Sequence, residues 1–478
     1  MPRVLLRWLK TIAYAFMPTL IRNWYSDEPE TTPKPRGTAY LDGARGLAAL
    51  VVFNYHFFYA YSDITQAAWD FRNPLSMPIL RLWSSGASAV PLFFIFGGYA
   101  IATKPLSQMQ KDGKERTEAA LVTLSSSAFR RIFRLYLPTA MITLMVAILI
   151  ELRIYEYTRS ILQDTSTTAD LLRLREKHLE ISGSAVRSLT RWLWDILMLS
   201  GLWDWKSYAP YHDRHLWTIQ TEYVCSIVVY VTLLATAQLK AGVRLLVVMI
   251  LSIHCLYWSR WDVADFYWGV ILAQLDTILD SSFKARQDGA GMTSTLPQSL
   301  EKSSISPRQS HLKHAFQEAG LHILLLFSFW CISAPAYAWN TAFGYQTLAK
   351  LVPSHYGAES KFIPAVGVVL LQRCLYISSP KSPRRAMFTN SVALYLGKIS
   401  FSLYLVHGPV LHAVGYSIPS LIWSIIGKEG IFGYGFGLVV GWVVSLILAL
   451  CAADVFHREI EARCILFTAW IERHCLKQ

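Results

Sequence analysis

The chain has few charged residues, and acidic residues are especially scarce. Only 16% of its 478 residues are Asp, Glu, Lys or Arg, with 32 acidic side chains against 45 basic ones. Soluble domains carry about a quarter charged residues. Hydrophobic residues make up 53% of the chain, and its mean hydropathy is positive. This composition argues against an ordinary soluble domain and indicates an integral membrane protein.

Common cofactor and metal motifs are also missing. The 7 cysteines are odd in number and form no CxxC pair, so neither a disulfide framework nor a zinc site is expected. The sequence contains no GxGxxG, Walker loop, GxSxG or HExxH, which removes the usual support for a nucleotide-binding protein or a soluble hydrolase. We therefore predict no metal ion and no tightly bound cofactor.

Apolar runs long enough to cross the roughly 30 Å hydrocarbon core of a bilayer recur along the whole chain. They predict an all-α integral membrane protein, a bundle of about ten transmembrane helices. The two runs on either side of residue 260 are so close that they predict a tight helical hairpin. The ten runs are 41–62, 86–104, 132–151, 216–238, 243–259, 262–280, 319–339, 361–379, 392–413 and 432–454.

Basic residues between the runs predict the orientation, because short cytosolic loops hold an excess of Lys and Arg. They gather before the first run, in the 105–131 loop, and in the loop with Lys381, Arg384 and Arg385. A multi-pass protein with both termini in the cytosol follows. The 152–215 connection is basic as well but falls on the other side, where the rule is weak for long loops. Topology thus explains the net charge of +13 better than nucleic acid binding does.

Three segments are expected along the chain. Residues 1–38 form a cytosolic N-terminal segment, in which 3–21 predict an amphipathic helix at the membrane surface, in contact with lipids; a cleaved signal peptide is the alternative. Residues 39–455 form the membrane domain, and 456–478 a cytosolic tail. Within the membrane domain, a stretch at about 281–315 is rich in Ser, Gly and Pro and predicts a disordered cytosolic loop.

The first apolar run carries two ionisable residues, Arg45 and His56. Such groups are costly inside a bilayer, so they tend to be retained for function and to face a protein interior or a wet cavity. Eleven residues bring a helix to within about 20° of its starting direction and raise it by about 16 Å. One helix face therefore carries a cation near one membrane surface and a titratable base deep inside.

Further basic residues lie at the same depth as Arg45, toward the predicted cytosolic surface. Arg130, Arg131 and Arg134 are spaced so that one helix end presents a cationic cluster, and Lys398 lies slightly deeper. Such a cluster can bind phosphate groups through charge-assisted hydrogen bonds. The alternative is that these side chains only set the topology and reach up to lipid headgroups.

Histidines and a glutamate lie toward the opposite surface, on three different runs. They are His56, His215 with Glu222, and His407. Glu222 follows His215 by nearly two turns, so both project from one face about 10 Å apart. A carboxylate beside an imidazole can orient a general base for a hydroxyl group, although structural hydrogen bonding is the alternative for each histidine. Phosphate-binding cations on one side and a base deeper in suit acyl-CoA, among other anionic substrates.

At these residues the chain resembles the acyltransferase 3 family of multi-pass membrane O-acyltransferases. Tyr40 to His56 is similar to the family's opening L-D-G-x-R-G-x-A-A-x-x-V-x-x-x-H. Pro91 to Tyr99 resembles its F-F-x-x-S-G-[FY] motif, and Arg130 to Pro138 its arginine-rich entry to the third span. His215 to Tyr223 resembles H-L-W-[ST]-L-x-x-E, and Gly397 to His407 resembles S-x-x-L-Y-L-x-H.

The resemblance implies a membrane enzyme that transfers an acyl group, commonly acetyl, from cytosolic acyl-CoA to a hydroxyl of a carbohydrate, lipid or small metabolite. By position, His56 would be the catalytic base, with Glu222 or His407 supporting its imidazole. Attack by the hydroxyl could be direct, or could follow an acyl-histidine intermediate. Two alternative functions remain: a transporter or channel lined by these charges, and a catalytically silent sensor or scaffold.

The resemblance also implies that Arg45, Arg131 and Arg134 would hold the donor. We add Arg130 and Lys398, which belong to the same cationic layer. The chain departs from the second family motif at two positions: the acidic residue usual before the double Phe is Pro91, and the Ser is Gly97.

Overall fold

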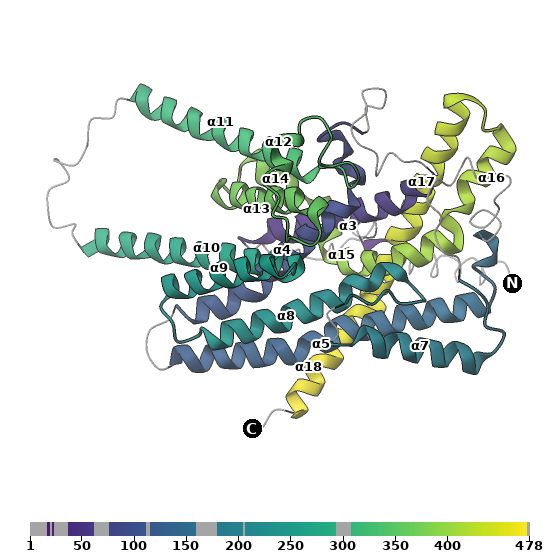
Figure 1. Cartoon of the computed structure of the whole chain (residues 1–478), viewed down its shortest axis with the longest axis horizontal. Coiled ribbons are helices and arrows are strands. Elements are labelled where there is room, and N and C mark those ends of the chain that lie inside the picture. Colours follow the sequence, from purple (N-terminus) through teal and green to yellow (C-terminus); the bar gives the residue numbers. More distant parts are fainter. Residues whose placement is uncertain are drawn as a thin grey trace.

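The computed structural model describes residues 17–19, 22, 37–61, 76–110, 115–158, 179–203, 206–292 and 307–475. Within these ranges it contains helices and no strand (Figure 1). Most of the 3–21 segment, for which an interfacial helix is expected, lies outside the described residues. The all-α fold predicted from the apolar runs is confirmed.

Each of the ten predicted membrane-spanning runs contains a helix. In chain order these are α3 (Ala39–Tyr59), α4 (Gly86–Gln108), α5 (Glu115–Glu151), α8 (Trp217–Ala235), α9 (Ala241–Tyr257), α10 (Trp261–Met292), α11 (Pro307–Ile332), α13 (Phe362–Ile377), α15 (Ser391–Val410) and α17 (Gly430–Phe456). The predicted hairpin corresponds to α9 and α10, which pack against each other.

Seven of the helices in the described part of the chain are long and apolar enough to cross a membrane. The other three predicted spans fall short for identifiable reasons. Helix α9 is apolar but short, whereas α3 and α10 carry charged residues, among them Asp265 and Asp276, whose side chains are buried inside the protein. The count of ten spans and the cytosolic placement of both termini therefore stay predictions.

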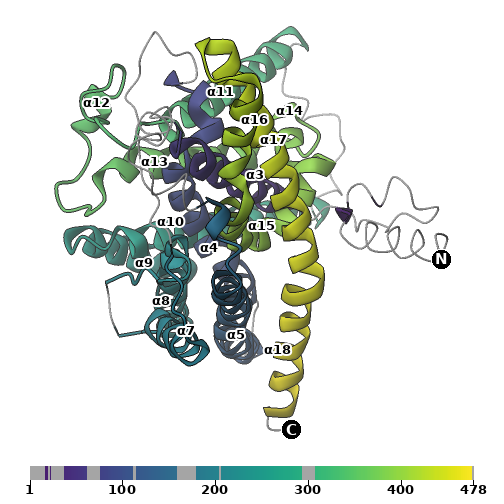
Figure 2. The ribbon, with the colours of Figure 1, turned by 90° about the vertical axis from the view of Figure 1, so that its right-hand side faces the viewer.

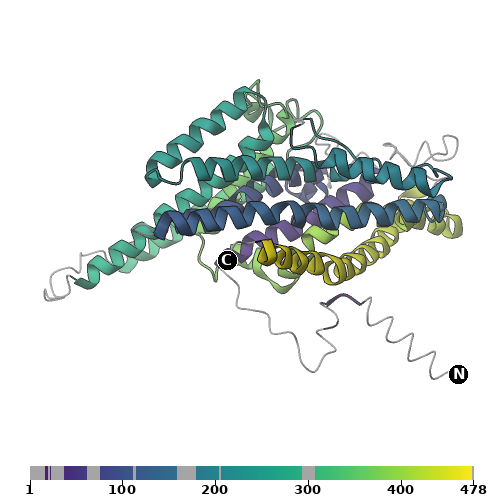
Figure 3. The same cartoon turned by 90° about the horizontal axis from the view of Figure 1, so that it is seen from below.

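Shorter helices connect or flank these ten. They are η3 (Leu80–Ser84), α7 (Ala185–Leu199), η4 (Arg214–Leu216), α12 (Gln346–Ala349), η5 (Glu359–Lys361), α14 (Pro383–Thr389) and α16 (Ser417–Ile426), with π-helical turns η6 (Leu411–Gly415) and η7 (His457–Glu461). Through η7, α17 continues into α18 (Ala462–Cys475), and the two run as one long helix along the side of the bundle (Figure 2). Helix α5 packs against α8, α7 and α18 (Figure 3).

Both ends of the 281–315 stretch, which is expected to be a disordered loop, are helical in the structure. Helix α10 continues to Met292 and α11 already begins at Pro307, so only 293–306 lie outside the described residues. Extending an existing helix adds one hydrogen bond for each residue fixed, without the cost of a new nucleus. The composition of 283–287, with Lys, Ala, Arg and Gln, favours that extension.

Helix α3 lies at the centre, packed between α15 and α4, and α4 packs in turn on α10 (Figure 1). The crossing of α3 with α15 and that of α4 with α10 both depend on glycine. A Cβ atom at Gly46 would lie 2.2 Å from the backbone nitrogen of Gly397, and one at Gly98 would lie 2.1 Å from the carbonyl oxygen of Phe266. Small residues allow membrane helices to approach this closely. The glycines thus fix how far apart the helices that carry the polar side chains can lie.

We predict that Gly98→Ala destabilises the protein in detergent, with a lower apparent Tm. The added methyl group would meet backbone rather than a movable side chain, and overpacking typically costs about 1–3 kcal/mol. The neighbouring Gly97→Ala is the matched control, because its Cβ would lie 3.4 Å from the Phe266 ring, an ordinary contact. Equal Tm values for the two variants in a fluorescence melt would contradict the close crossing of α4 and α10.

Candidate active site

Three histidines from three different elements meet in the structure. The ring centroids of His56 on α3 and His215 on η4 are 3.9 Å apart, and each lies 5.2 Å from the centroid of His407 on α15. His56 and His215 line a cavity of about 590 Å³. No group of three His, Cys, Asp or Glu side chains in the described residues could hold a metal ion. Imidazole rings this close together can take up a proton and pass it on near neutral pH.

Backbone and carboxylate contacts orient two of the three rings. The His407 Nδ1–H donates to the carbonyl oxygen of Tyr404, 2.6 Å away, which leaves Nε2 as the acceptor in the neutral ring. His215 Nδ1 lies 3.0 Å from Oδ1 of Asp213, and the same oxygen accepts the backbone N–H of His215. The Asp213 carboxylate therefore lies beside the imidazole of His215.

Asp213 is not among the site residues predicted from the sequence. Asp213 precedes the span and caps η4, a place where Asp side chains commonly accept a backbone N–H. An Asp two residues before a candidate histidine at a helix start could have revealed it. Gly408 of α15 packs against this pair: a Cβ there would lie 3.0 Å from both Asp213 Oδ2 and His215 Nδ1. The aspartate and its histidine are thus held by helix packing on α15.

Glu222 lines the same cavity but pairs with an arginine rather than with a histidine. Its Oε1 accepts a hydrogen bond of 2.7 Å from Nη2 of Arg131, whose Nε donates to Ser226 Oγ at 3.0 Å. The sequence analysis placed Glu222 with the base and Arg131 with the donor. The structure joins the two in one ion pair between α8 and α5.

The predicted donor-binding cations separate into two groups. Arg45 lines the cavity, and its Nε is buried without a hydrogen-bond partner among the described residues. Arg130, Arg134 and Lys398 do not line the cavity. Arg130 lies 3.4 Å from Glu472 of α18, while Arg134 and Lys398 are exposed. Of the five cations, only Arg45 lines the cavity together with His56 and His215, whereas Arg131 contacts the lining residue Glu222.

Aromatic rings make up much of the remaining wall, among them Tyr55, Tyr59, Phe93, Trp217 and Tyr404. The Tyr404 hydroxyl donates to the backbone carbonyl of His215, and it lies 2.5 Å from Thr218 Oγ1. Tyr404 therefore ties α15 to the start of α8, next to the histidines.

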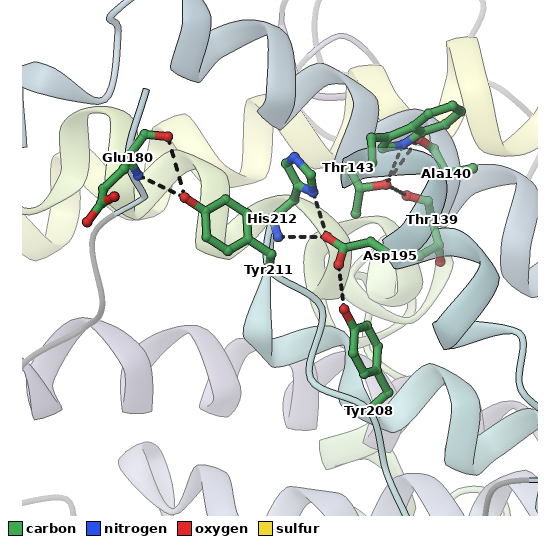
Figure 4. A network of polar contacts seen from close by, with 9 residues as sticks. Thr139, Ala140, Thr143, Glu180, Asp195, Tyr208, Tyr211 and His212 are labelled. Carbon is green, nitrogen blue, oxygen red and sulfur yellow. Dashed lines mark hydrogen bonds and ion pairs between the residues drawn. The ribbon is translucent and has the colours of Figure 1, made fainter. Parts of the chain in front are cut away.

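A buried network anchors the segment that leads into Asp213 (Figure 4). Asp195 on α7 is 1% exposed, and its Oδ2 lies 2.6 Å from Nδ1 of His212. The Tyr208 hydroxyl donates to Oδ1 of Asp195 at 2.7 Å. Burial by itself raises the pKa of the Asp195 carboxyl, but hydrogen bonds from His212 and Tyr208 outweigh it and hold that pKa below its usual value. An ionised Asp195 thus fixes the chain just before Asp213.

Comparison with known proteins gives a consistent result. A family model described as an acyltransferase domain matches residues 38–278 and 308–458, which include all the cavity residues named above. The chain is 25% identical to the O-acetyltransferase PaAT-1 of Phomopsis amygdali, over 96% of this chain and 89% of that protein. It is 25% identical to the acyltransferase clz18 of Cochliobolus lunatus, over 91% of this chain and 95% of that protein. No solved structure matches the chain with statistical significance.

We predict that Asp195→Asn lowers the apparent Tm at pH 7, because breaking a buried pair typically costs about 3–5 kcal/mol. The folded pKa of Asp195 is depressed, so its contribution is fully present above the unfolded pKa of about 3.9 and is lost as the pH falls through the folded pKa. The Tm difference from wild type should therefore shrink below about pH 4. Glu180→Gln, with an exposed side chain, is the control. A difference that persists unchanged at low pH would refute the charge-based account.

Proposed function

Since the chain belongs to the acyltransferase 3 family of membrane enzymes, we propose that it is an O-acyltransferase that moves an acyl group, acetyl in the simplest case, from acyl-CoA to a hydroxyl group of an acceptor molecule. The observation that carries this proposal is the position of His56. Its ring lies beside His215 and His407, in a cavity that also contains the Arg45 side chain.

In the proposed reaction His56 acts as the general base. It takes the proton of the acceptor hydroxyl while the hydroxyl oxygen adds to the thioester carbonyl carbon. The tetrahedral intermediate then collapses by breaking its carbon–sulfur bond. The His56 imidazolium returns the proton to the leaving CoA thiolate, so the base is regenerated.

In the tetrahedral intermediate the former carbonyl oxygen carries negative charge, which a hydrogen-bond donor must stabilise. The Tyr404 hydroxyl already donates to the His215 carbonyl, so it is not available for that purpose. We assign the role to His215, because it lines the cavity beside His56 and, when doubly protonated with Asp213 3.0 Å from its Nδ1 as counter-charge, it offers its Nε2–H as a strong donor. Asp213 then acts as a positioning residue through His215.

The donor would enter from the Arg45 end of the cavity, which we expect to face the cytosol. Arg45 and His56 lie on one face of α3, separated by about 16 Å along the helix. This separation suits a thioester on a long arm, with its acyl carbon at the histidines. A cavity of about 590 Å³ is of the size that holds one drug-sized ligand, so the nucleotide head of CoA would lie outside it, toward Arg130, Arg134 and Lys398.

The first test removes the proposed general base, His56. We expect His56→Ala to lower transfer of label from [14C]acetyl-CoA by at least about 100-fold, the usual contribution of a general base, at unchanged protein abundance. Purified protein in lipid nanodiscs is assayed with a small-molecule extract of the source cells. His254→Ala, an exposed histidine on α9, is the control. Activity of His56→Ala within a few-fold of wild type would exclude His56 as the base.

The second test concerns the donor. Arg45→Ala should raise the KM for acetyl-CoA about tenfold or more, because a lost charge-assisted hydrogen bond is worth about 1.5–3 kcal/mol. Arg45→Lys should recover only part, since an ammonium group cannot copy the planar fork of guanidinium. Arg187→Ala, an exposed arginine on α7, is the control. A normal KM with reversed topology in a cysteine-accessibility assay would make Arg45 an orientation signal only.

A further inference from the structure

Two more cations line the cavity at the end opposite to Arg45. Lys361 ends η5 and caps the start of α13, while Arg214 immediately precedes His215. Neither belongs to the donor-binding set. Both lie at the end of the cavity where the histidines are, since Arg214 and His215 are neighbours in η4.

The Lys361 ammonium is surrounded by aromatic rings. Its Nζ lies 4.1 Å from the ring centroid of Trp261 and 5.1 Å from that of Trp217. Within the described residues, neither the Lys361 ammonium nor the exposed Arg214 guanidinium takes part in an ion pair or a hydrogen bond. Indole rings attract a cation but do not neutralise it.

The acidic residues near Lys361 have other partners. Both oxygens of Asp262 are held by Arg260, at 2.9 and 2.6 Å. Asp265 is fully buried, and its Oδ1 accepts the Tyr356 hydroxyl at 2.9 Å, while its Oδ2 has no hydrogen-bond partner among the described residues. Neither carboxylate lies within ion-pair distance of the Lys361 ammonium, so the cation keeps the capacity to bind an anion from the cavity.

Positive charge predominates throughout the cavity wall. Its cations are Arg45, Arg214 and Lys361, and its one carboxylate, Glu222, is already matched by Arg131. Helices α4, α8 and α13 also begin at the Lys361 end, and the partial positive charge of a helix N-terminus adds to the field there. With a neutral ligand, the desolvated Lys361 ammonium would have only Asp262 and Asp265, which lie beyond ion-pair distance, as counter-charges.

From this arrangement we infer that the acceptor is an organic acid: a hydroxyl-bearing molecule with an apolar or aromatic body and a carboxylate that binds Lys361 and Arg214. The inference rests on the proposed function, and it names the class of acceptor. The carboxylate anchors the molecule at one end of the cavity, its body packs on Tyr55, Tyr59 and Trp217, and its hydroxyl reaches His56.

The class of acceptor can be tested before its identity is known. Wild-type protein in nanodiscs is incubated with [14C]acetyl-CoA and the small-molecule extract, either untreated or with its carboxylates esterified by trimethylsilyldiazomethane. We expect labelled products that are retained by an anion exchanger at pH 7 and that disappear with the esterified extract. Neutral products, or products unaffected by esterification, would overturn this inference alone. No transfer of label from any extract would overturn the proposed function itself.

Variants then test which residues bind the carboxylate of the acceptor. With the purified acidic acceptor, Lys361→Met should raise the acceptor KM at least tenfold and leave the KM for acetyl-CoA within about twofold, whereas Lys361→Arg should retain most of the binding. Arg214→Gln changes an exposed side chain of the cavity lining and should also raise the acceptor KM, which keeps the test valid if Lys361→Met folds poorly. Lys350→Met, an exposed lysine, is the control. A raised KM for acetyl-CoA instead would assign these cations to the donor.

Discussion

The close packing of α3 between α15 and α4 is the constraint on which the site depends. At Gly46 and Gly397 two helix backbones approach so closely that no side chain fits between them. This approach places His56 of α3 beside His407 of α15, a contact between residues far apart in sequence. Gly408 extends the same principle, since its missing side chain leaves room for Asp213 and His215. The glycines thus allow the three histidines and Asp213 to lie close together.

Charged residues inside the bundle fall into two kinds. Arg373 pairs with Asp276, and Arg131 with Glu222, in contacts that join neighbouring helices. Such pairs satisfy buried charges within the protein. By contrast, no ion pair within the described residues includes Arg45, Arg214 or Lys361, and all three line the one cavity that also holds His56 and His215. Charges kept without a protein partner next to a proton-transfer cluster are available to a ligand.

The two departures from the family's second motif lie outside the cavity wall. Val90, Phe93 and Phe94 line the cavity, whereas Pro91 and Gly97 do not. Gly97 faces the ring of Phe266 on α10, and its neighbour Gly98 meets the Phe266 backbone. The changes therefore affect the packing of α4 on α10 rather than the histidines, and they give no support to a catalytically silent protein.

Hydrophobicity and local spacing determined much of this protein from sequence alone. Long apolar runs predicted ten of the helices, because the bilayer requires such lengths, and the spacing of Arg45 and His56 placed both on one face of one helix. Other features depend on contacts between distant segments. Only the tertiary structure shows that Glu222 forms an ion pair with Arg131 and that Asp213 lies beside His215. It also brought Lys361, the first residue of the predicted run 361–379, into the cavity, because helix crossings and loop paths determine which side chains come together.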